Sequence, residues 1–553
     1  DGARAATVGE CGRLVAAHVA AGMEGASQGE AARAQRSGEV GEGRRPGHGG
    51  SVAASRRGGT SVLRGGNARG ARTGALLACA AMRELARDLL ALDHLDPAAI
   101  EAVVLRHAGP GPRYTSYPTV PTWSEAYGPA ELRRDLGAVV PGGEISLYVH
   151  VPFCPSLCHF CACNRVITRS PDPPARWLDA IEREIALVRE ALPAAPRVVQ
   201  HHWGGGTPTH LEPAQIARLH RALSDAFPAD SGAEVSIEVD PRVTGEAHVD
   251  ALRACGFTRI SMGVQDFDPR VQAAVHRVQG VEVTAALVER ARRAGFASVG
   301  FDLIYGLPFQ SVASMERTLD HVLAIAPDRI ALYGYAHVTW VAKQQRGFER
   351  HDLPAPGERL RIQRTAIRKL LGAGYEPVGM DHYARPDDEL ARAARERRLR
   401  RNFMGYTTRP GLDLLALGPS AITELAAAFA QSHRELAAWE QAVRAGQLAT
   451  LRGHALSDDD RRRRWVITEI MCHGSVSPEA FRARFDLDFA ACFAAERAAL
   501  EPLAEEGLVE LDVDGGLRIT ALGHLAVRPV AMVFDAYLPG QRAAERPLFS
   551  QTV

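Results

Sequence analysis

Strand-like and helix-like segments alternate six times in the middle of the chain, and this alternation limits the fold more than any other feature. Short apolar runs rich in β-branched residues occupy 145–152, 197–203, 234–240, 259–265, 298–307 and 328–336. Helical periodicity follows each run, and the helix expected over 281–294 ends at Gly295, a residue that commonly terminates helices. Repeated strand–helix units produce parallel strands joined by right-handed crossovers. We therefore expect an α/β fold.

Six such units do not close a standard eight-stranded barrel, so we expect a partial (βα)6 barrel with room for a large substrate at its mouth. In parallel α/β folds, functional residues gather at the carboxyl ends of the strands. The residues expected at these ends are nearly all polar, glycine or cysteine: Cys154, 204–207, Glu238, Gln265, Asp302 and 336–337. We predict that the functional site is built from them.

The flanking regions differ from this central part. Residues 1–81 are rich in Gly, Ala, Arg and Ser, and no aromatic residue precedes Tyr114, so we expect a disordered or spurious N-terminal extension. A transit peptide is a weaker alternative because the segment contains several glutamates. We expect a helical or lid segment over 82–143, the barrel and following α/β elements over 144–435, and a helical domain with a hairpin over 436–553.

Charge and hydropathy argue against two classes of partner. Lys+Arg and Asp+Glu are both 65, which makes the formal net charge +0, whereas a generic nucleic-acid-binding protein needs a basic excess. We find no apolar run that approaches the ~18 residues of a membrane-spanning helix. The C-terminal region resembles a winged-helix unit, but acidic 458–460 beside basic 461–464 favours a packing or lid domain over DNA binding. We expect a cytoplasmic monomer.

Four of the nine cysteines form the strongest signal in the chain: Cys154, Cys158, Cys161 and Cys163, within YVHVPFCPSLCHFCACN. Structural zinc usually needs two separated pairs of ligands, and no second Cys-x2-Cys pair is present. Three soft thiolates in a C-x3-C-x2-C loop suit a [4Fe–4S] cluster with one iron left open to a ligand. We assign Cys154, Cys158 and Cys161 as cluster ligands and Cys163 as a free thiol, with structural zinc as the alternative.

This loop, at the end of the first strand of a parallel βα unit, resembles the motif of the radical S-adenosylmethionine (SAM) superfamily. The stretch WGGGTP over 203–208 ends the second strand and resembles the superfamily motif that meets the SAM amino group. Its glycines would let the backbone approach a ligand closely. Glu238 ends the third strand, where a carboxylate would bind a ribose or an ammonium group.

Longer strings resemble one family within that superfamily, the oxygen-independent coproporphyrinogen III oxidases. They are GPRYTSYPT (111–119), LYVHVPFC, HWGGGTPT, IEVDPR, SMGVQDF, DLIYGLP, YAH (335–337), GMDHYARPDDELA (379–391) and RNFMGYTT (401–408). The resemblance extends from about Tyr114 to Val553. Thr339 departs from it, because proline is expected after the YAH string.

The resemblance implies a radical reaction on a tetrapyrrole. The reduced cluster would cleave SAM, and the 5'-deoxyadenosyl radical would take a hydrogen atom from the β-carbon of a substrate propionate. Two propionates of coproporphyrinogen III would lose carbon dioxide and become vinyl groups, which gives protoporphyrinogen IX for haem biosynthesis. An electron donor for the cluster and an electron acceptor of unknown identity would take part.

The resemblance also implies two bound SAM molecules and their contacts. The first would contact Tyr148, Gly205, Glu238 and Ile422. The second would contact Phe160, Gly206, Thr207, Gln265, Arg277, Asp302 and Ala336. We assign catalytic roles to Cys163, whose thiol would lie close to the SAM sites, and to Tyr114, whose segment we expect to fold over the barrel mouth. The substrate pocket should contain arginines and aromatic residues, and its candidates are Arg113, Tyr114, Arg385 and Arg401.

Two rival functions are compatible with the superfamily motif. A radical-SAM-like haem chaperone would lack Cys163 and the RYTSYPT string, and both are present here. Another tetrapyrrole-acting radical SAM enzyme, such as a methyltransferase or a haem-degrading relative, is the second alternative.

Overall fold

The structure is a computed structural model that describes residues 82–542 and 548–552. The expectation for residues 1–81 lies outside these described residues. Within them, no helix has the combination of length and apolar character that crossing a membrane requires.

A twelve-stranded mixed sheet forms the larger part of the molecule, in the order β16-β15-β14-β13-β1-β4-β5-β6-β7-β8-β10-β9. Its central strands are parallel and are those that the sequence predicts: β1 (Glu144–Val151), β4 (Arg197–Gly205), β5 (Ala229–Val239), β6 (Arg259–Gln265), β7 (Ser298–Tyr305) and β8 (Arg329–Gly334). The sheet curves without closing, since β8 is followed by the antiparallel β10 (His382–Ala384) and then β9 (Glu376–Val378). The expected partial barrel is therefore confirmed.

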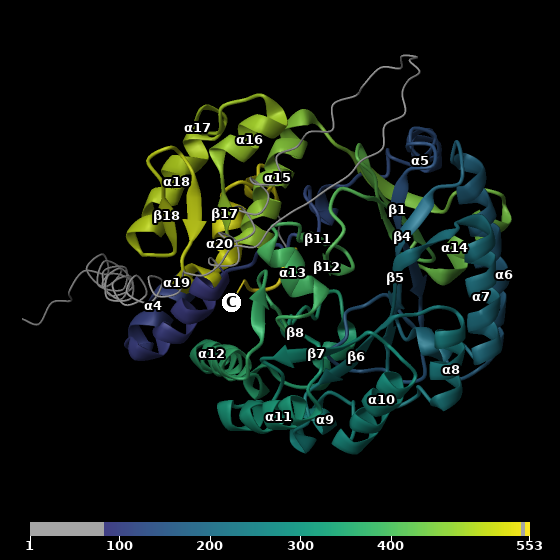
Figure 1. Cartoon of the computed structure of the whole chain (residues 1–553), viewed down its shortest axis with the longest axis horizontal. Helices are drawn as coiled ribbons and strands as arrows, with labels where there is room; N and C mark the ends of the chain where they lie inside the picture. Colours follow the sequence, from purple (N-terminus) through teal and green to yellow (C-terminus); the bar gives the residue numbers. More distant parts are fainter. Residues whose placement is uncertain (1–81, 543–547, 553) are drawn as a thin grey trace, which may run out of the picture.

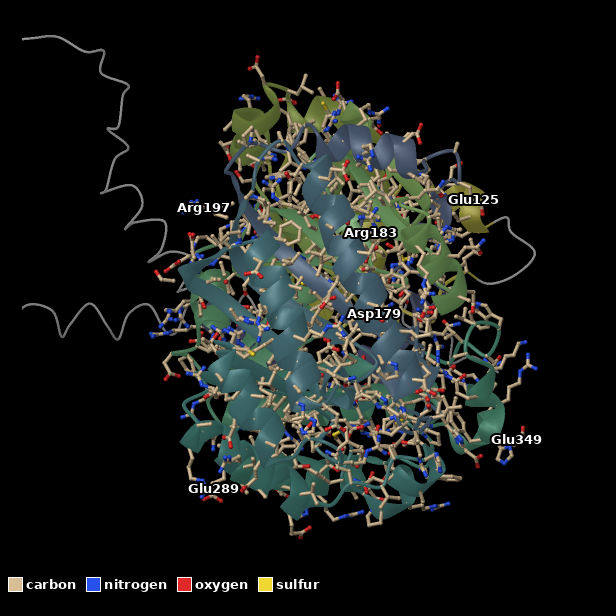
Figure 2. The ribbon with its side chains drawn as sticks, turned by 90° about the vertical axis from the view of Figure 1, so that its right-hand side faces the viewer. Glu125, Asp179, Arg183, Arg197, Glu289 and Glu349 are labelled. Carbon is tan, nitrogen blue, oxygen red and sulfur yellow. The ribbon has the colours of Figure 1, made fainter. Side chains whose placement is uncertain are left out.

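Helices cover the outer face of the curved sheet (Figure 1). They are α6 (Asp172–Ala191), α7 (Pro213–Ala226), α8 (Glu246–Ala254), α9 (Pro269–Ala274), α10 (Val281–Arg293), α11 (Val312–Ile325) and α12 (Pro356–Gly372). Each longer helix buries one face, and Asp179 and Arg183 of α6 lie on the opposite, solvent side (Figure 2). Gly295 follows α10 with a φ of +86°, as expected for the residue that ends this helix.

The alternation of side chains along a strand separates the core from the interior of the barrel. In β6, Met262 and Val264 are buried among the core residues, whereas the alternate residues Ser261 and Gln265 line the interior. The sequence therefore builds an apolar outer face under the helices and a polar inner face.

The sheet extends further along the chain than we expected. The strands β13 (Asp413–Leu417), β14 (Ile422–Glu424), β15 (Ala428–Ser432) and β16 (Thr450–Ala455) add to it beside β1, and α14 (Leu436–Arg444) packs against α6. The boundary expected after residue 435 is therefore wrong, because residues up to Ala455 belong to the sheet. The helical pattern of 436–444 shows a helix but not the unit against which it packs.

Residues from Asp458 onward form a smaller, mainly helical unit. Its elements are α15 (Asp458–His473), β17 (Ser475–Val476), α16 (Pro478–Phe485), α17 (Phe489–Cys492), α18 (Ala494–Glu505), β18 (Val509–Leu511), β19 (Leu517–Ile519), α19 (Ala521–His524), α20 (Val527–Met532) and α21 (Leu538–Arg542). The antiparallel β18–β19 pair confirms the predicted hairpin around Gly515. Arg461 and Arg463 of α15 form ion pairs with Asp458 and Asp459, at 2.7 and 2.6 Å.

The segment before the barrel joins the two units. It contains α4 (Pro97–Arg106) and α5 (Pro129–Leu136) with the 111–119 string between them. The Arg113 Nη2 donates to the Gly334 carbonyl at the end of β8, at 2.7 Å. The Tyr114 hydroxyl donates to Asp535 Oδ2 of the smaller unit at 3.0 Å. The string thus bridges the barrel and the C-terminal unit.

Candidate active site

A cavity of about 560 Å³ occupies the interior of the curved sheet. It brings together most of the predicted site residues: Cys154, Cys158, Phe160, Cys161, Cys163, Gly205, Gly206, Thr207, Glu238, Gln265, Arg277, Asp302 and Ala336. Of the predicted residues, all of which the structure describes, Tyr114, Tyr148 and Ile422 are not part of the lining, nor are the substrate candidates Arg385 and Arg401. The carboxyl ends of the parallel strands thus form one concave site, as the sequence predicts.

The cysteine loop follows β1 and is held by a short parallel pair, β2 (Phe153–Cys154) with β3 (Val166–Ile167). Cys154 Sγ lies 3.4 Å from Thr207 Oγ1, and burial raises the pKa of the Cys154 thiol to about 11. Cys158 is buried, while Cys163 is exposed. The Cys163 thiol adjoins Cys161 and lowers the pKa of the Cys161 thiol.

This donor set fits an iron–sulfur cluster. Cys154, Cys158 and Cys161 come from one loop and line one cavity, and thiolates are the ligands that iron–sulfur clusters take. Among the described residues, no three His, Cys, Asp or Glu side chains are grouped to hold a single metal ion.

Two arginines that flank Cys158 are tied together by a buried carboxylate. Arg242 Nη2 and Arg277 Nη1 each lie 3.6 Å from Cys158 Sγ, and the same two atoms lie 2.6 and 3.1 Å from Asp240 Oδ2. Burial opposes the ionisation of Asp240, but the two guanidinium groups hold its pKa below the usual range. The sequence indicated Arg277 but not Asp240 or Arg242, although both belong to the IEVDPR string.

The glycines after β4 are needed because the chain itself crowds them. A Cβ on Gly206 would lie 2.7 Å from the Pro152 carbonyl, and one on Gly205 would lie 2.7 Å from the His150 ring. Gly205 also has a φ of +116°, which favours glycine. We expected these glycines to admit a ligand, whereas the structure shows that they first allow β4 to pack against the end of β1.

Two carboxylates face the cavity with different surroundings. Glu238 is held by His202 Nε2 at 3.3 Å and by the Gly205 amide at 3.2 Å, and these contacts lower its pKa although burial opposes ionisation. Burial raises the pKa of Asp302 to about 7, and the charge of Glu238 adds to this rise. Asp302 lies within β7 rather than at its end. One carboxylate is therefore kept ionised while the other can hold a proton near neutral pH.

Tyr148 lies behind the cavity wall. Its hydroxyl is 3.1 Å from His150 Nδ1, and His150 Nε2 is 2.9 Å from the Asn164 carbonyl, directly after Cys163. Because Nε2 donates to that carbonyl, Nδ1 accepts from the tyrosine. Tyr148 and His150 thus connect β1 to the end of the cysteine loop.

Two further predicted residues are connected by a glutamine that the sequence did not single out. The side-chain amide of Gln345 donates to the Phe160 carbonyl at 2.8 Å and to the Ala336 carbonyl at 3.0 Å. Gln345 is fully buried. It therefore links the cysteine loop to the chain beyond β8. Gln265, on the cavity wall, has a φ of +69°, an unusual conformation for a residue other than glycine.

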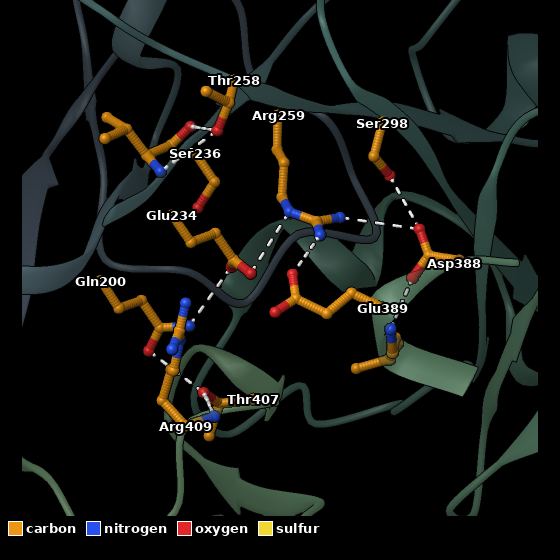
Figure 3. Close-up of polar contacts among 12 residues, drawn as sticks. Gln200, Glu234, Ser236, Thr258, Arg259, Ser298, Asp388, Glu389, Thr407 and Arg409 are labelled. Carbon is orange, nitrogen blue, oxygen red and sulfur yellow. Dashed lines mark hydrogen bonds and ion pairs between the residues drawn. The ribbon is translucent and has the colours of Figure 1, made fainter. Parts of the chain in front are cut away.

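A network of charged side chains closes the cavity at the amino ends of the strands (Figure 3). Arg259 Nη2 donates to Glu389 Oε2 at 2.7 Å, and its Nε lies 3.2 Å from Glu234 Oε2. Asp388 receives Arg329 Nε at 2.8 Å. Asp388 and Glu389 stand at the start of α13 (Glu389–Arg395), which is followed by the hairpin β11 (Arg400–Asn402) and β12 (Gly405–Thr407). These ion pairs attach α13 and the following hairpin to the amino ends of the strands, which we call the barrel floor.

The structure places the remaining candidates away from the cavity or in other contacts. Tyr114 is buried with its hydroxyl on Asp535, so the catalytic role we assigned to it finds no support in its position. Ile422 packs in an apolar cluster with Trp123 and Phe429. Arg401 is buried against Asp381, at 3.5 Å. Long-range packing decides these positions, and local sequence does not reveal it.

Comparisons with known proteins agree with this geometry. The family model described as the radical SAM superfamily matches residues 148–322, and that of the HemN C-terminal domain matches residues 456–525. The oxygen-independent coproporphyrinogen III oxidases of Escherichia coli (strain K12) and Pseudomonas aeruginosa are 44% and 42% identical, over 82% of this chain and 98% of each relative. A solved structure, coproporphyrinogen III oxidase (HemN) from Escherichia coli, matches 77% of this chain and 97% of its own with a TM-score of 0.74. This chain belongs to the family of oxygen-independent coproporphyrinogen III oxidases within the radical SAM superfamily.

Proposed function

We propose that this protein catalyses the oxygen-independent oxidative decarboxylation of two propionate groups of coproporphyrinogen III to vinyl groups, which yields protoporphyrinogen IX. The observation that carries the proposal is the single cavity that the C-x3-C-x2-C loop shares with the carboxylates and glycines of the neighbouring strand ends. The 44% identity to the Escherichia coli enzyme over almost its whole length supports the same reaction.

The cofactors of the family are a [4Fe–4S] cluster and SAM. Cys154, Cys158 and Cys161 would hold the cluster. SAM would be held at the cavity wall by residues of β4, β5, β6 and β7 and of the loops that follow β4, α9 and β8: Gly205, Gly206, Thr207, Glu238, Gln265, Arg277, Asp302 and Ala336. When bound, the cluster and SAM supply one-electron reduction and a carbon radical.

The residues of the chain prepare the cavity for that chemistry. Arg242 and Arg277 place positive charge beside Cys158. Glu238, kept ionised by His202 and Gly205, provides an acceptor for hydroxyl or ammonium groups. Arg113 contributes a cation to the wall on which a substrate carboxylate would bind.

Cys163 remains our proposed catalytic thiol. It is exposed and lines the same cavity as the three assigned ligands. A thiol in this position would handle substrate or transfer hydrogen. For Tyr114 we propose a positioning role instead, since it ties the string that carries Arg113 to the C-terminal unit.

The compartment and assembly state belong to the same proposal. We place the enzyme in the cytoplasm, because the described residues contain free thiols at Cys154, Cys158, Cys161, Cys163, Cys255, Cys472 and Cys492, as expected in a reducing compartment. We propose that it acts as a monomer, since one chain supplies the whole cavity lining.

Anaerobic turnover tests the function. Reconstituted protein mixed with coproporphyrinogen III, SAM and dithionite should form protoporphyrinogen together with methionine and 5'-deoxyadenosine, and the Cys158→Ala variant should form none. Tight haem binding without any turnover would support the chaperone alternative and overturn the proposal.

A further inference from the structure

Large apolar side chains are exposed on the loops around the cysteine loop. Of nine large hydrophobic residues exposed in the described part of the chain, four are in these loops: Ile167, Val278, Trp340 and Val341, at 43%, 73%, 40% and 54% exposure. None of these four lines the cavity. Core packing and cavity formation therefore do not account for them.

Direct contacts connect all three loops to the cysteine loop. Ile167 pairs with Cys154 in the β2–β3 register. His276, two residues before Val278, donates through Nδ1 to the Leu157 carbonyl at 2.9 Å. Gln345, shortly after Trp340 and Val341, donates to the Phe160 carbonyl. The four apolar residues thus belong to a single rim, which we call the cluster-side rim.

The cluster-side rim is also positively charged. Segments 155–170 and 338–352 contain five basic residues and two acidic ones: Arg165, Arg169, Lys343, Arg346 and Arg350 against Glu349 and Asp352. Lys343, Arg346 and Arg350 are exposed, and in the described structure none of them forms an ion pair. Glu349, which belongs to the same segment, projects at the edge of the molecule (Figure 2). The whole chain has a formal net charge of +0, so these two segments are more basic than the chain as a whole.

We propose that the cluster-side rim is the docking surface for an acidic protein that carries single electrons, and this inference rests on the proposed function. The carrier would be oxidised by one electron and the enzyme-bound cluster reduced by one, with no bond made or broken. An exposed apolar centre beside unpaired cations is the composition of a transient, electrostatically steered interface. Because the rim loops are hydrogen-bonded to the cysteine loop, a carrier docked on the cluster-side rim lies next to the cluster ligands.

The charge-reversal pair Lys343→Glu and Arg346→Glu tests the docking surface. The matched control is Arg221→Glu on α7, an exposed arginine on the outer face of the barrel. The probe is a reduced acidic ferredoxin mixed with the holoenzyme, with cluster reduction followed by stopped-flow absorbance and binding by calorimetry. Ferredoxin should reduce the cluster of the double variant roughly tenfold more slowly than that of the parent at low salt, and the difference should shrink at high salt. The control should match the parent.

Dithionite separates this inference from the proposed function. Dithionite-driven formation of protoporphyrinogen should be the same in the double variant and the parent, which also shows that the variant is folded and loaded with iron. Trp340→Ala, with charge unchanged, should weaken ferredoxin binding without altering its salt dependence. Equal ferredoxin binding and reduction rates in parent, double variant and Trp340→Ala would overturn the docking surface. Absence of dithionite-driven turnover in the parent would instead overturn the proposed function.

Discussion

Replacing Asp240 with asparagine tests how the site controls charge beside Cys158. Asp240 is 5% exposed and accepts from Arg242 Nη2 at 2.6 Å and Arg277 Nη1 at 3.1 Å. Asparagine has nearly the same shape but no charge, so the two guanidinium groups remain without their carboxylate. We expect two effects: the cluster-free protein should lose stability, and the reduction potential of the bound cluster should rise.

The cluster-free protein should lose stability. Breaking a buried ion pair costs roughly 3–5 kcal/mol. The Arg242 side chain is 20% exposed and the asparagine oxygen still accepts one hydrogen bond, so we expect about 3 kcal/mol, at the lower end of that range. Thermal unfolding monitored by circular dichroism measures this loss, and Asp240→Glu, which keeps the charge, is the control.

The bound cluster should become easier to reduce. The two contacts of Arg242 Nη2 place Asp240 Oδ2 within about 6 Å of Cys158 Sγ, where removal of a unit charge changes the energy by ~3 kcal/mol at an effective dielectric constant of 20. For one electron this corresponds to a rise of about 130 mV in reduction potential. A redox titration followed by electron paramagnetic resonance measures the potential. An unchanged or lower potential at parental iron content would refute this charge balance.

Three further changes test other parts of the structure. Burial raises the pKa of Glu184 to about 7, although Trp439 Nε1 and the Gly418 amide donate to it. The contribution of the Glu184 carboxyl to stability is complete below the unfolded pKa near 4.5 and is lost as pH rises through 7. Glu184→Gln should therefore abolish ~3 kcal/mol of pH dependence in unfolding experiments, and an unaltered pH profile would contradict this. Cys163→Ser should keep its iron but lower turnover at least about tenfold, whereas Cys161→Ala should lose its iron; a Cys163→Ser protein without cluster would make Cys163 a ligand. Tyr114→Phe should lower stability by about 1–3 kcal/mol because Asp535 Oδ2 stays buried without the Tyr114 hydroxyl. Turnover at saturating substrate should stay near the parental value, and loss of turnover in the folded variant would restore the catalytic role.

Local patterns in the sequence were sufficient for the six parallel strands and for the cysteine loop. Apolar runs of strand length followed by helical periodicity define each unit, and the turn between them determines where its strand ends. Cys154, Glu238 and Gln265 therefore reach one cavity because parallel strands bring their carboxyl ends to one edge. The spacing of the cysteines acts within one loop and needs no distant partner.

The tertiary structure alone decided which distant residues complete the site and the sheet. Ile145 of β1 pairs with Asp413 of β13, and Glu389 of α13 meets Arg259 on the barrel floor. Tyr114 turns to Asp535, far along the chain, and so lies outside the cavity that the adjacent Arg113 lines. A single sequence does not reveal such contacts between distant segments. They depend on complementary shape and charge, which exist only once the two surfaces pack together.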